Sequence, residues 1–258
     1  MGKAGQCSLR YAIRVQCPGR EAEHPPQTDV TDWTQLEAAF NAAVDTFGRL
    51  DIVCPGAAIS DPPKYNFWSL KSGGDTAATS TYKTLEINIT HPIRCTQLAI
   101  DYFMRQKLEH GTVLHMTSVA AQTPSAVVPL YHTSKAAISH FVRSMAPLEQ
   151  IYNIRINAVA PANVKTSIWI DAGRAGYLDE EKGDEWITPE RLADVMMDML
   201  TGRKYIGGSI WEVGVDVLRK VELINDPGPD LTARGFTHAN VGLAQTQLRE
   251  MLEENFGK

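Results

Sequence analysis

The spacing of apolar positions along the middle of the chain switches repeatedly between a helical and a strand-like period. Between residues 32 and 48, apolar side chains recur every three or four positions, which predicts an amphipathic helix that Thr31 and Asp32 can cap. Residues 50–54 form a short apolar run that ends at a Pro-Gly pair, as a buried strand running into a turn does. This alternation is typical of a parallel sheet with helices on both faces.

The same alternation continues to about residue 221, so we predict an α/β fold with a three-layer parallel sheet. Residues 29–226 form its main domain, residues 1–28 an atypical N-terminal segment, and residues 227–258 a C-terminal loop and helix. The one alternating run near the start, residues 11–17, fits a strand and disorder equally well. The predicted elements are helices over 83–108 and 131–150, strands over 111–117 and 154–160, a helix that opens at 188–190, and a last strand over 209–213.

Composition and charge restrict the classes of partner. The chain has 258 residues, 43% of them hydrophobic, and a formal net charge of −5. An acidic chain lacks the basic surface that nucleic acids and anionic membranes select, so we predict neither as a partner. The four cysteines have no CxxC spacing, the seven histidines form no ligand pair, and no apolar run reaches the length of a membrane span. We therefore expect free thiols, no metal site and a cytoplasmic protein.

Tyr131 and Lys135 stand four residues apart at the start of a predicted helix, which places both side chains on one face. A phenol with a pKa near 10 exchanges protons poorly at neutral pH. Lowering that pKa by about three units takes roughly 4 kcal/mol, which one ammonium group at ~4 Å can supply at moderate dielectric. The pair therefore predicts an acid/base for carbonyl or alcohol chemistry, although YxxxK alone often occurs by chance.

Two polar residues precede this pair. Ser118 follows the predicted strand over 111–117, and open α/β sheets bind ligands at the carboxyl ends of their strands. Asn88 lies within the predicted helix over 83–108. Taken singly, the serine also fits a turn former and the asparagine a group that satisfies local backbone.

Together these segments resemble the short-chain dehydrogenase/reductase family, with features similar to its fungal, 15-hydroxyprostaglandin-dehydrogenase-like branch. The resemblance covers residues 28–215 and implies a Rossmann-like fold. It rests on TDVTD at 28–32, LDIVCPGAA at 50–58, NIT at 88–90, TSVAA and YHTSK across 117–135, and INAVAPANVKT at 156–166.

The resemblance implies a role for each candidate residue. Tyr131 would exchange a proton with the substrate oxygen, and Lys135 would lower the pKa of Tyr131 and bind the nicotinamide ribose. Ser118 would polarise the substrate carbonyl, and Asn88 would anchor a water that relays protons to Lys135. Contacts to an NAD(P)(H) cofactor are implied for Asp29, Gly56, Tyr131, Lys135, Val164 and Thr166.

One part of the family pattern is missing, so the N-terminal half of the fold is expected to be incomplete. Relatives open with a strand, a TGxxxGxG turn and a helix whose amides bind the pyrophosphate. Here Asp29 arrives about 35–40 residues too early for such a unit, and no such glycine motif occurs. In addition, the turn at 55–58 lacks an asparagine near the cofactor. Ala162 replaces a glycine, which is harmless if its φ is negative.

Three explanations of the missing start stay open. The reading frame begins at the wrong exon and the natural enzyme is longer, or the chain is a truncated relative that acts as a non-redox isomerase or cyclase or as a scaffold. The third explanation is that residues 1–28 supply a substitute edge strand beside a weakened cofactor site. We favour the first, because the acid/base set is complete.

Residues 167–187 carry several aromatic side chains, including Trp169 and Trp186. In the family this region closes over substrate, and a small apolar cluster packed on the sheet fits the pattern equally well. If it is a lid, it suits a bulky, apolar ketone or alcohol. We therefore expect an NAD(P)(H)-dependent oxidoreductase that interconverts a ketone and a secondary alcohol on a hydrophobic small molecule, compatible with a fungal secondary-metabolite pathway. Relatives pair through the helices over 83–108 and 131–150, which predicts a homodimer or homotetramer.

Overall fold

The computed structural model describes residues 27–222 except 72, 175 and 177. It also describes the short strands at 11–12, 16–17 and 20–21 and two single positions, 250 and 253. The predicted C-terminal loop and helix over 227–258 thus lie outside the described residues, apart from those two positions. Among the described residues, no helix combines the length and apolarity needed to cross a bilayer.

A five-stranded sheet with the order β5-β6-β7-β8-β9 forms the centre of the molecule. Its first four strands run parallel, and β9 is antiparallel to β8. The strand predicted over 209–213 is confirmed as β8, but it is not the last one, because the chain turns at Gly214 and adds β9 as a hairpin. The bounds are β5 (Ile52–Val53), β6 (Gly111–Met116), β7 (Ile154–Pro161), β8 (Ile210–Val213) and β9 (Leu218–Lys220).

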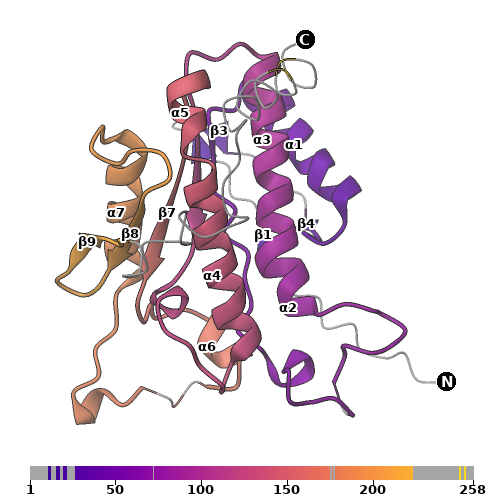
Figure 1. Cartoon of the computed structure of the whole chain (residues 1–258), viewed down its shortest axis with the longest axis vertical. Coiled ribbons are helices and arrows are strands. Elements are labelled where there is room, and N and C mark those ends of the chain that lie inside the picture. Colours follow the sequence, from indigo (N-terminus) through magenta and orange to yellow (C-terminus); the bar gives the residue numbers. More distant parts are fainter. Residues whose placement is uncertain are drawn as a thin grey trace, which may run out of the picture.

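Helices cover both faces of this sheet and confirm the predicted three-layer α/β class (Figure 1). One face carries α1 (Trp33–Phe47), α3 (His91–Arg105) and α4 (Pro129–Ser144), whose apolar side chains pack on alternate residues of β6 and β7. The other face carries α7 (Pro189–Thr201), which packs on the intervening residues. Asp32 caps α1 as predicted, and its carboxylate accepts the N–H groups of Thr34 and Gln35.

The two helices that carry most of the predicted site are interrupted. In place of one helix over 83–108, the chain forms α2 (Lys83–Leu85), a π-helical turn η2 (Glu86–Thr90) and α3. Single π turns of this kind are frequent at functional sites, and this one holds Asn88. The predicted helix over 131–150 breaks before α5 (Pro147–Tyr152), because a proline inside a helix removes a backbone hydrogen bond.

The N-terminal segment forms two small antiparallel ribbons. Strand β4 (Gln27–Thr28) pairs with β1 (Tyr11–Ala12), and β2 (Gln16–Cys17) pairs with β3 (Arg20–Glu21). Neither ribbon joins the five-stranded sheet. Where residues 1–28 are described, they therefore do not supply the substitute edge strand considered above.

Strand β5 is less buried than the apolar run over 50–54 predicted. Val53 packs against the core beneath α1 and α3, but Ile52 is 45% exposed and Cys54 is exposed. The reason is position: β5 is the edge of the sheet and, among the described residues, β6 is its one neighbour in that sheet. The prediction of a fully buried strand was therefore wrong on one face.

Candidate active site

A cavity of about 550 Å³ lies at the carboxyl ends of β5, β6 and β7. The strand ends, the first turns of α4 and the chain from Asn163 to Arg174 line it. Open α/β sheets bind ligands at this edge. The cavity brings together six of the predicted site residues, namely Gly56, Ser118, Tyr131, Lys135, Val164 and Thr166.

Ser118 is held between two strand ends. It directly follows β6 and caps the short 3₁₀ turn η3 (Val119–Ala121), where its Oγ accepts the N–H of Ala120 at 3.2 Å. The same hydroxyl donates to the carbonyl of Pro161 at the end of β7, at 3.3 Å. Tyr131 lines the same cavity, and the serine hydroxyl lowers the pKa of its phenol. The serine is thus fixed in place to orient an oxygen atom beside the phenol.

The surroundings of Tyr131 differ from the prediction. Burial raises the pKa of the phenol, and the Ser118 hydroxyl and the charge of Arg174 oppose that rise, whereas we expected Lys135 to lower it. The position of the ammonium group accounts for this difference, and the role of Lys135 toward the phenol stays a prediction. The Nζ of Lys135 donates to the carbonyl of Met116 at 2.9 Å and lies 5.5 Å from the centre of the tyrosine ring.

Lys135 is almost completely enclosed by protein, with 3% of its surface exposed. Burial disfavours the charged ammonium and lowers its pKa from 10.5 to about 8. The group can therefore both hold and release a proton near neutral pH, a property typical of lysines in catalytic sites.

Asn88 lies behind the cavity and connects its walls. Its amide oxygen accepts the N–H of Ile59 at 2.9 Å, and its Nδ2 donates to the carbonyl of Ile59 at 2.8 Å and to Ser134 Oγ at 3.0 Å. Ser134 in turn donates to the carbonyl of Tyr131 at 2.7 Å. Asn88 thus ties the loop after β5 to α4, and its water relay to Lys135 stays a prediction.

Asp29, like Asn88, is a predicted site residue that does not line the cavity. Its exposed carboxylate accepts the backbone N–H and the hydroxyl of Thr31, at 2.9 and 2.7 Å. The ammonium of Lys83 donates to the same threonine hydroxyl at 2.9 Å. These contacts organise the turn before α1, and the predicted adenine contact of Asp29 stays a prediction.

The segment that follows β7 forms one wall of the cavity. Ala162 is absent from the residues with positive φ, so its replacement of a glycine costs no backbone strain. The indole of Trp169, in α6 (Ile168–Asp171), donates to the carbonyl of Val164 at 3.0 Å and lines the cavity. It meets the ring of Trp186 edge-on, with 5.3 Å between the ring centres.

Two charged residues beside the cavity were missed in the sequence. Arg174 lines the cavity, and Asp61 is buried at the first turn of α4. Neither belongs to a motif or a repeating pattern, so no local signal marks them. Their connection joins segments more than a hundred residues apart and exists in the folded chain alone.

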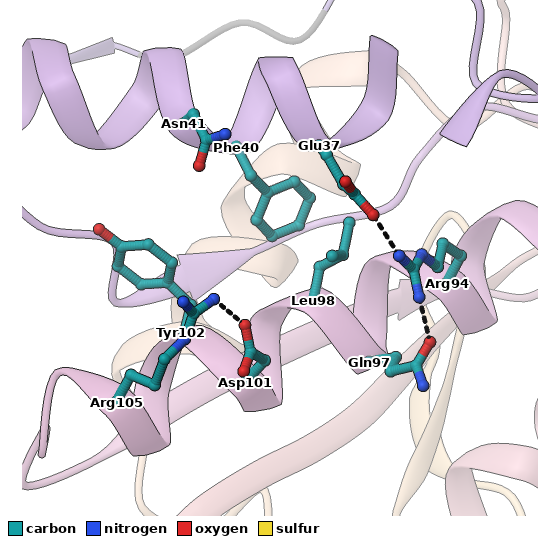
Figure 2. A pocket seen from close by; sticks show the side chains of 9 residues that line it. All are labelled: Glu37, Phe40, Asn41, Arg94, Gln97, Leu98, Asp101, Tyr102 and Arg105. Atoms are coloured by element: carbon teal, nitrogen blue, oxygen red, sulfur yellow. Dashed lines mark hydrogen bonds and ion pairs between the residues drawn. The ribbon is translucent and has the colours of Figure 1, made fainter. Parts of the chain in front are cut away.

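A second hollow, of about 430 Å³, lies between α1 and α3 (Figure 2). Its charged side chains bind one another. Arg94 pairs with Glu37 across the two helices and donates to Gln97 at 2.6 Å, and Arg105 pairs with Asp101. Because these charges are already paired, the cavity at the strand ends is the stronger candidate for acid/base chemistry.

The cavity residues suit one end of a nicotinamide cofactor. Lys135 and the hydroxyl of Thr166 lie on its walls, and Gly56 leaves open space, since a Cβ there would meet nothing closer than 3.9 Å. Among the described residues, the cations that line it are Lys135 and Arg174. A nicotinamide with its ribose therefore has candidate partners, whereas a glycine-rich turn for the pyrophosphate is not among the described residues.

Comparison with known proteins points to one enzyme family. The short chain dehydrogenase family model matches residues 13–175. 15-Hydroxyprostaglandin dehydrogenase (NAD(+)) of Homo sapiens is 35% identical over 145 residues, which are 55% of this chain and 48% of the human protein. Short-chain dehydrogenase/reductase prx6 of Penicillium rubens is 32% identical over 143 residues, 54% and 48% of the two chains. The chain spans about half the length of the curated relatives it matches.

Solved structures confirm the Rossmann-like fold. The 3-ketoacyl-(acyl-carrier-protein) reductase of Brucella melitensis, complexed with NADH, gives a TM-score of 0.62 at 19% identity and covers 74% of this chain and 76% of its own. A 7α-hydroxysteroid dehydrogenase, complexed with NADH and 7-oxo glycochenodeoxycholic acid, gives 0.60 at 24% identity, with coverages of 73% and 72%. At these identities the likeness shows the fold alone. The family model, which matches more than half of the chain, shows that the protein belongs to the short chain dehydrogenase family.

Proposed function

We propose that this chain is an NAD(P)(H)-dependent oxidoreductase that interconverts a ketone and a secondary alcohol on a bulky, hydrophobic small molecule. The observation that carries the proposal is that Ser118, Tyr131 and Lys135 line one cavity at the carboxyl ends of the strands. The dehydrogenases and reductases to which the chain is similar support the reaction class.

The chain's own residues handle the proton and the substrate oxygen. Tyr131 donates its phenolic proton to the ketone oxygen during reduction and takes a proton from the alcohol during oxidation. Ser118, which lines the cavity together with Tyr131, contacts the same oxygen and holds it in line. A bound nicotinamide supplies or accepts the hydride, which no protein side chain can do.

Lys135, buried in the wall of the cavity, supplies protons to Tyr131. Because its pKa is about 8, the ammonium exchanges protons readily at neutral pH and can restore the proton that Tyr131 passes on. The carbonyl of Met116 holds it in the resting arrangement. Rotation away from that carbonyl would bring it to the phenol or to the nicotinamide ribose, the partner that the family resemblance implies.

The walls of the cavity favour an apolar substrate. A volume of about 550 Å³ lies in the range of pockets for drug-sized molecules. Choice between NAD and NADP stays open in this proposal. A place in a fungal secondary-metabolite pathway is part of the proposal, and its support is similarity to a short-chain dehydrogenase/reductase of a fungus. The apolar residues that line the cavity include Val119, Val127, Val128, Ile168, Trp169 and Leu192.

We also propose that the chain works as a homodimer or homotetramer in the cytoplasm. The outward side of α3 carries the exposed Ile93 and one wall of the hollow in Figure 2, which suits packing against another helix. Light scattering coupled to gel filtration would measure the assembly. Ile93→Glu should shift the protein toward monomer if α3 forms the contact.

Activity should be tested on a panel of bulky apolar secondary alcohols and ketones, with each of the four nicotinamide cofactors at millimolar concentration. Nicotinamide absorbance that changes with substrate in the wild type, and no longer in Tyr131→Phe, supports the proposal. Equal rates for the two proteins would refute it.

A further inference from the structure

Asp61 lies at the first turn of α4 in a strained backbone conformation. Its backbone lies in the left-handed region, with φ at 37°, and its carboxylate is buried. The Oδ2 atom accepts the N–H of Leu130, the residue directly before Tyr131, at 3.2 Å. A negative charge at the first turn of a helix is favoured by the helix dipole. Asp61 therefore anchors the turn of α4 that carries the candidate acid/base.

Arg174 connects the segment after α6 to the same loop. Its Nη1 donates to the carbonyl and the hydroxyl of Ser60, at 3.1 and 3.0 Å, and its Nη2 donates to the carbonyl of Asp61 at 3.3 Å. Among the described residues, no carboxylate oxygen lies within 4.0 Å of this guanidinium. Its charge thus acts on the cavity that it lines.

We propose that Asp61 and Arg174 are positioning residues for Tyr131: Asp61 holds the first turn of α4, and Arg174 fastens the segment after α6 to the loop at 60–61. The inference rests on the proposed function, in which Tyr131 transfers the proton. It adds two residues of opposite charge, from segments 113 positions apart, that set the geometry and the ionisation of one phenol.

The two charges act on the phenol in opposite senses. Burial raises the pKa of Tyr131 most, the charge of Asp61 raises it further, and the charge of Arg174 lowers it. Replacing each residue alone should therefore move the titration of Tyr131 in opposite directions. The other groups that face the ring or share its cavity are Lys135 and His132 from α4, Asp171 from α6 and the hydroxyl of Ser118.

The test is a ¹³C NMR titration of the Tyr131 ring carbon that bears the hydroxyl, assigned by its loss in Tyr131→Phe. Asp61→Asn should lower the pKa of the phenol, and Arg174→Met should raise it. Asparagine keeps an acceptor oxygen and tolerates a left-handed backbone, so the loop should persist. The double variant should titrate between the two single variants, because the two charge changes oppose each other.

A matched pair of variants separates positioning from a general charge effect. Arg174→Lys keeps the charge but loses the planar fork, so the titration should stay near that of the wild type while amide exchange over 167–173 becomes faster. Lys182→Met removes an exposed cation from the same segment and should change neither. In turnover assays, Arg174→Met should lower kcat about tenfold and shift the pH profile upward.

The inference is overturned if Asp61→Asn and Arg174→Met move the Tyr131 titration in the same direction or leave it unmoved. Titration needs no turnover, so its result stays readable even if no substrate of the panel reacts. Absence of activity in the wild type would count against the proposed function. An unmoved titration with an active wild type would count against this inference alone.

Discussion

The two sides of the active-site cavity differ in how completely the described residues build them. On the side of β6, β7 and α4, strand ends are buried, and Ser118 and Lys135 are each fixed by backbone hydrogen bonds. On the side of β5, Ile52 is 45% exposed and, among the described residues, the outer edge of the strand is unpaired. The acid/base groups belong to the first side, and a phosphate cradle would belong to the second. Chemistry and cofactor affinity are therefore carried by different segments and can be measured separately.

The largest expected effect concerns cofactor affinity on the β5 side. The 258 residues contain no TGxxxGxG turn, and backbone amides of such a turn form charge-assisted hydrogen bonds worth about 1.5–3 kcal/mol each. Without two or three of them, the dissociation constant for NAD(H) or NADP(H) should be roughly a hundredfold to a millionfold higher. A fusion that places a strand, TGxxxGxG and a helix before Asp29 should recover the affinity, as calorimetry would show.

The matched control is the same fusion with the three glycines changed to alanine, which keeps the added length but blocks the close backbone approach. Micromolar binding by the 258 residues themselves would contradict the prediction. It would mean that the segment before Asp29 or the cations Lys135 and Arg174 hold the pyrophosphate.

The next largest effect is on kcat and concerns the side of the cavity formed by β6, β7 and α4. Tyr131→Phe removes the ionisable oxygen and should lower kcat about a hundredfold to ten-thousandfold at saturating cofactor, because a positioned acid/base contributes that much. Circular dichroism and the melting temperature should change little. Lys135→Met should lower kcat and also raise the dissociation constant of the cofactor. Thr133→Val, an exposed neighbour on α4, is the control and should keep full activity.

The features that could be predicted from the sequence are those that depend on local pattern. Periodicity is local, so it located α1, α3, α4 and the strands β5 to β8. Motif spacing identified Ser118, Tyr131 and Lys135, which line one cavity. The partner of Lys135 could not be predicted, because the 2.9 Å contact with the Met116 carbonyl depends on how deeply the ammonium is buried. The exposure of β5 depends on which strands flank it. The contacts of Arg174 with Ser60 could not be predicted either, because the two residues are 114 positions apart in the sequence.

Two buried histidines should give the folding stability a pH dependence of intermediate size. His91 and His115 are buried, and desolvation lowers their pKa values from 6.5 to about 4 and about 3. The unfolded chain binds protons that the folded chain refuses, so stability is full above pH 6.5 and falls as the pH drops toward 4. Each histidine should cost roughly 3–5 kcal/mol at the acid limit.

Melting curves between pH 7 and pH 4 measure this loss. His115→Gln, which has no group that charges in acid, should flatten the pH dependence, with its amide able to replace the 2.9 Å contact between His115 and Thr96 Oγ1. His140→Gln, at an exposed position on α4, is the control and should leave the slope unchanged. A slope that is equal in all three proteins would show that other groups cause the acid sensitivity.

The smallest expected effect distinguishes a lid from a packed cluster in the segment over 167–187. Trp169 lines the cavity, whereas Trp186 packs edge-on against the ring of Trp169. Trp169→Ala should therefore raise KM for a bulky substrate about 5- to 30-fold, the loss of one aromatic contact, and Trp186→Ala should raise it less. Ile170→Ala, at a position that is 69% exposed, should change neither KM nor melting temperature. If both tryptophan variants melt earlier while KM and kcat stay at wild-type values, the segment is a packed cluster on the sheet and closes over nothing.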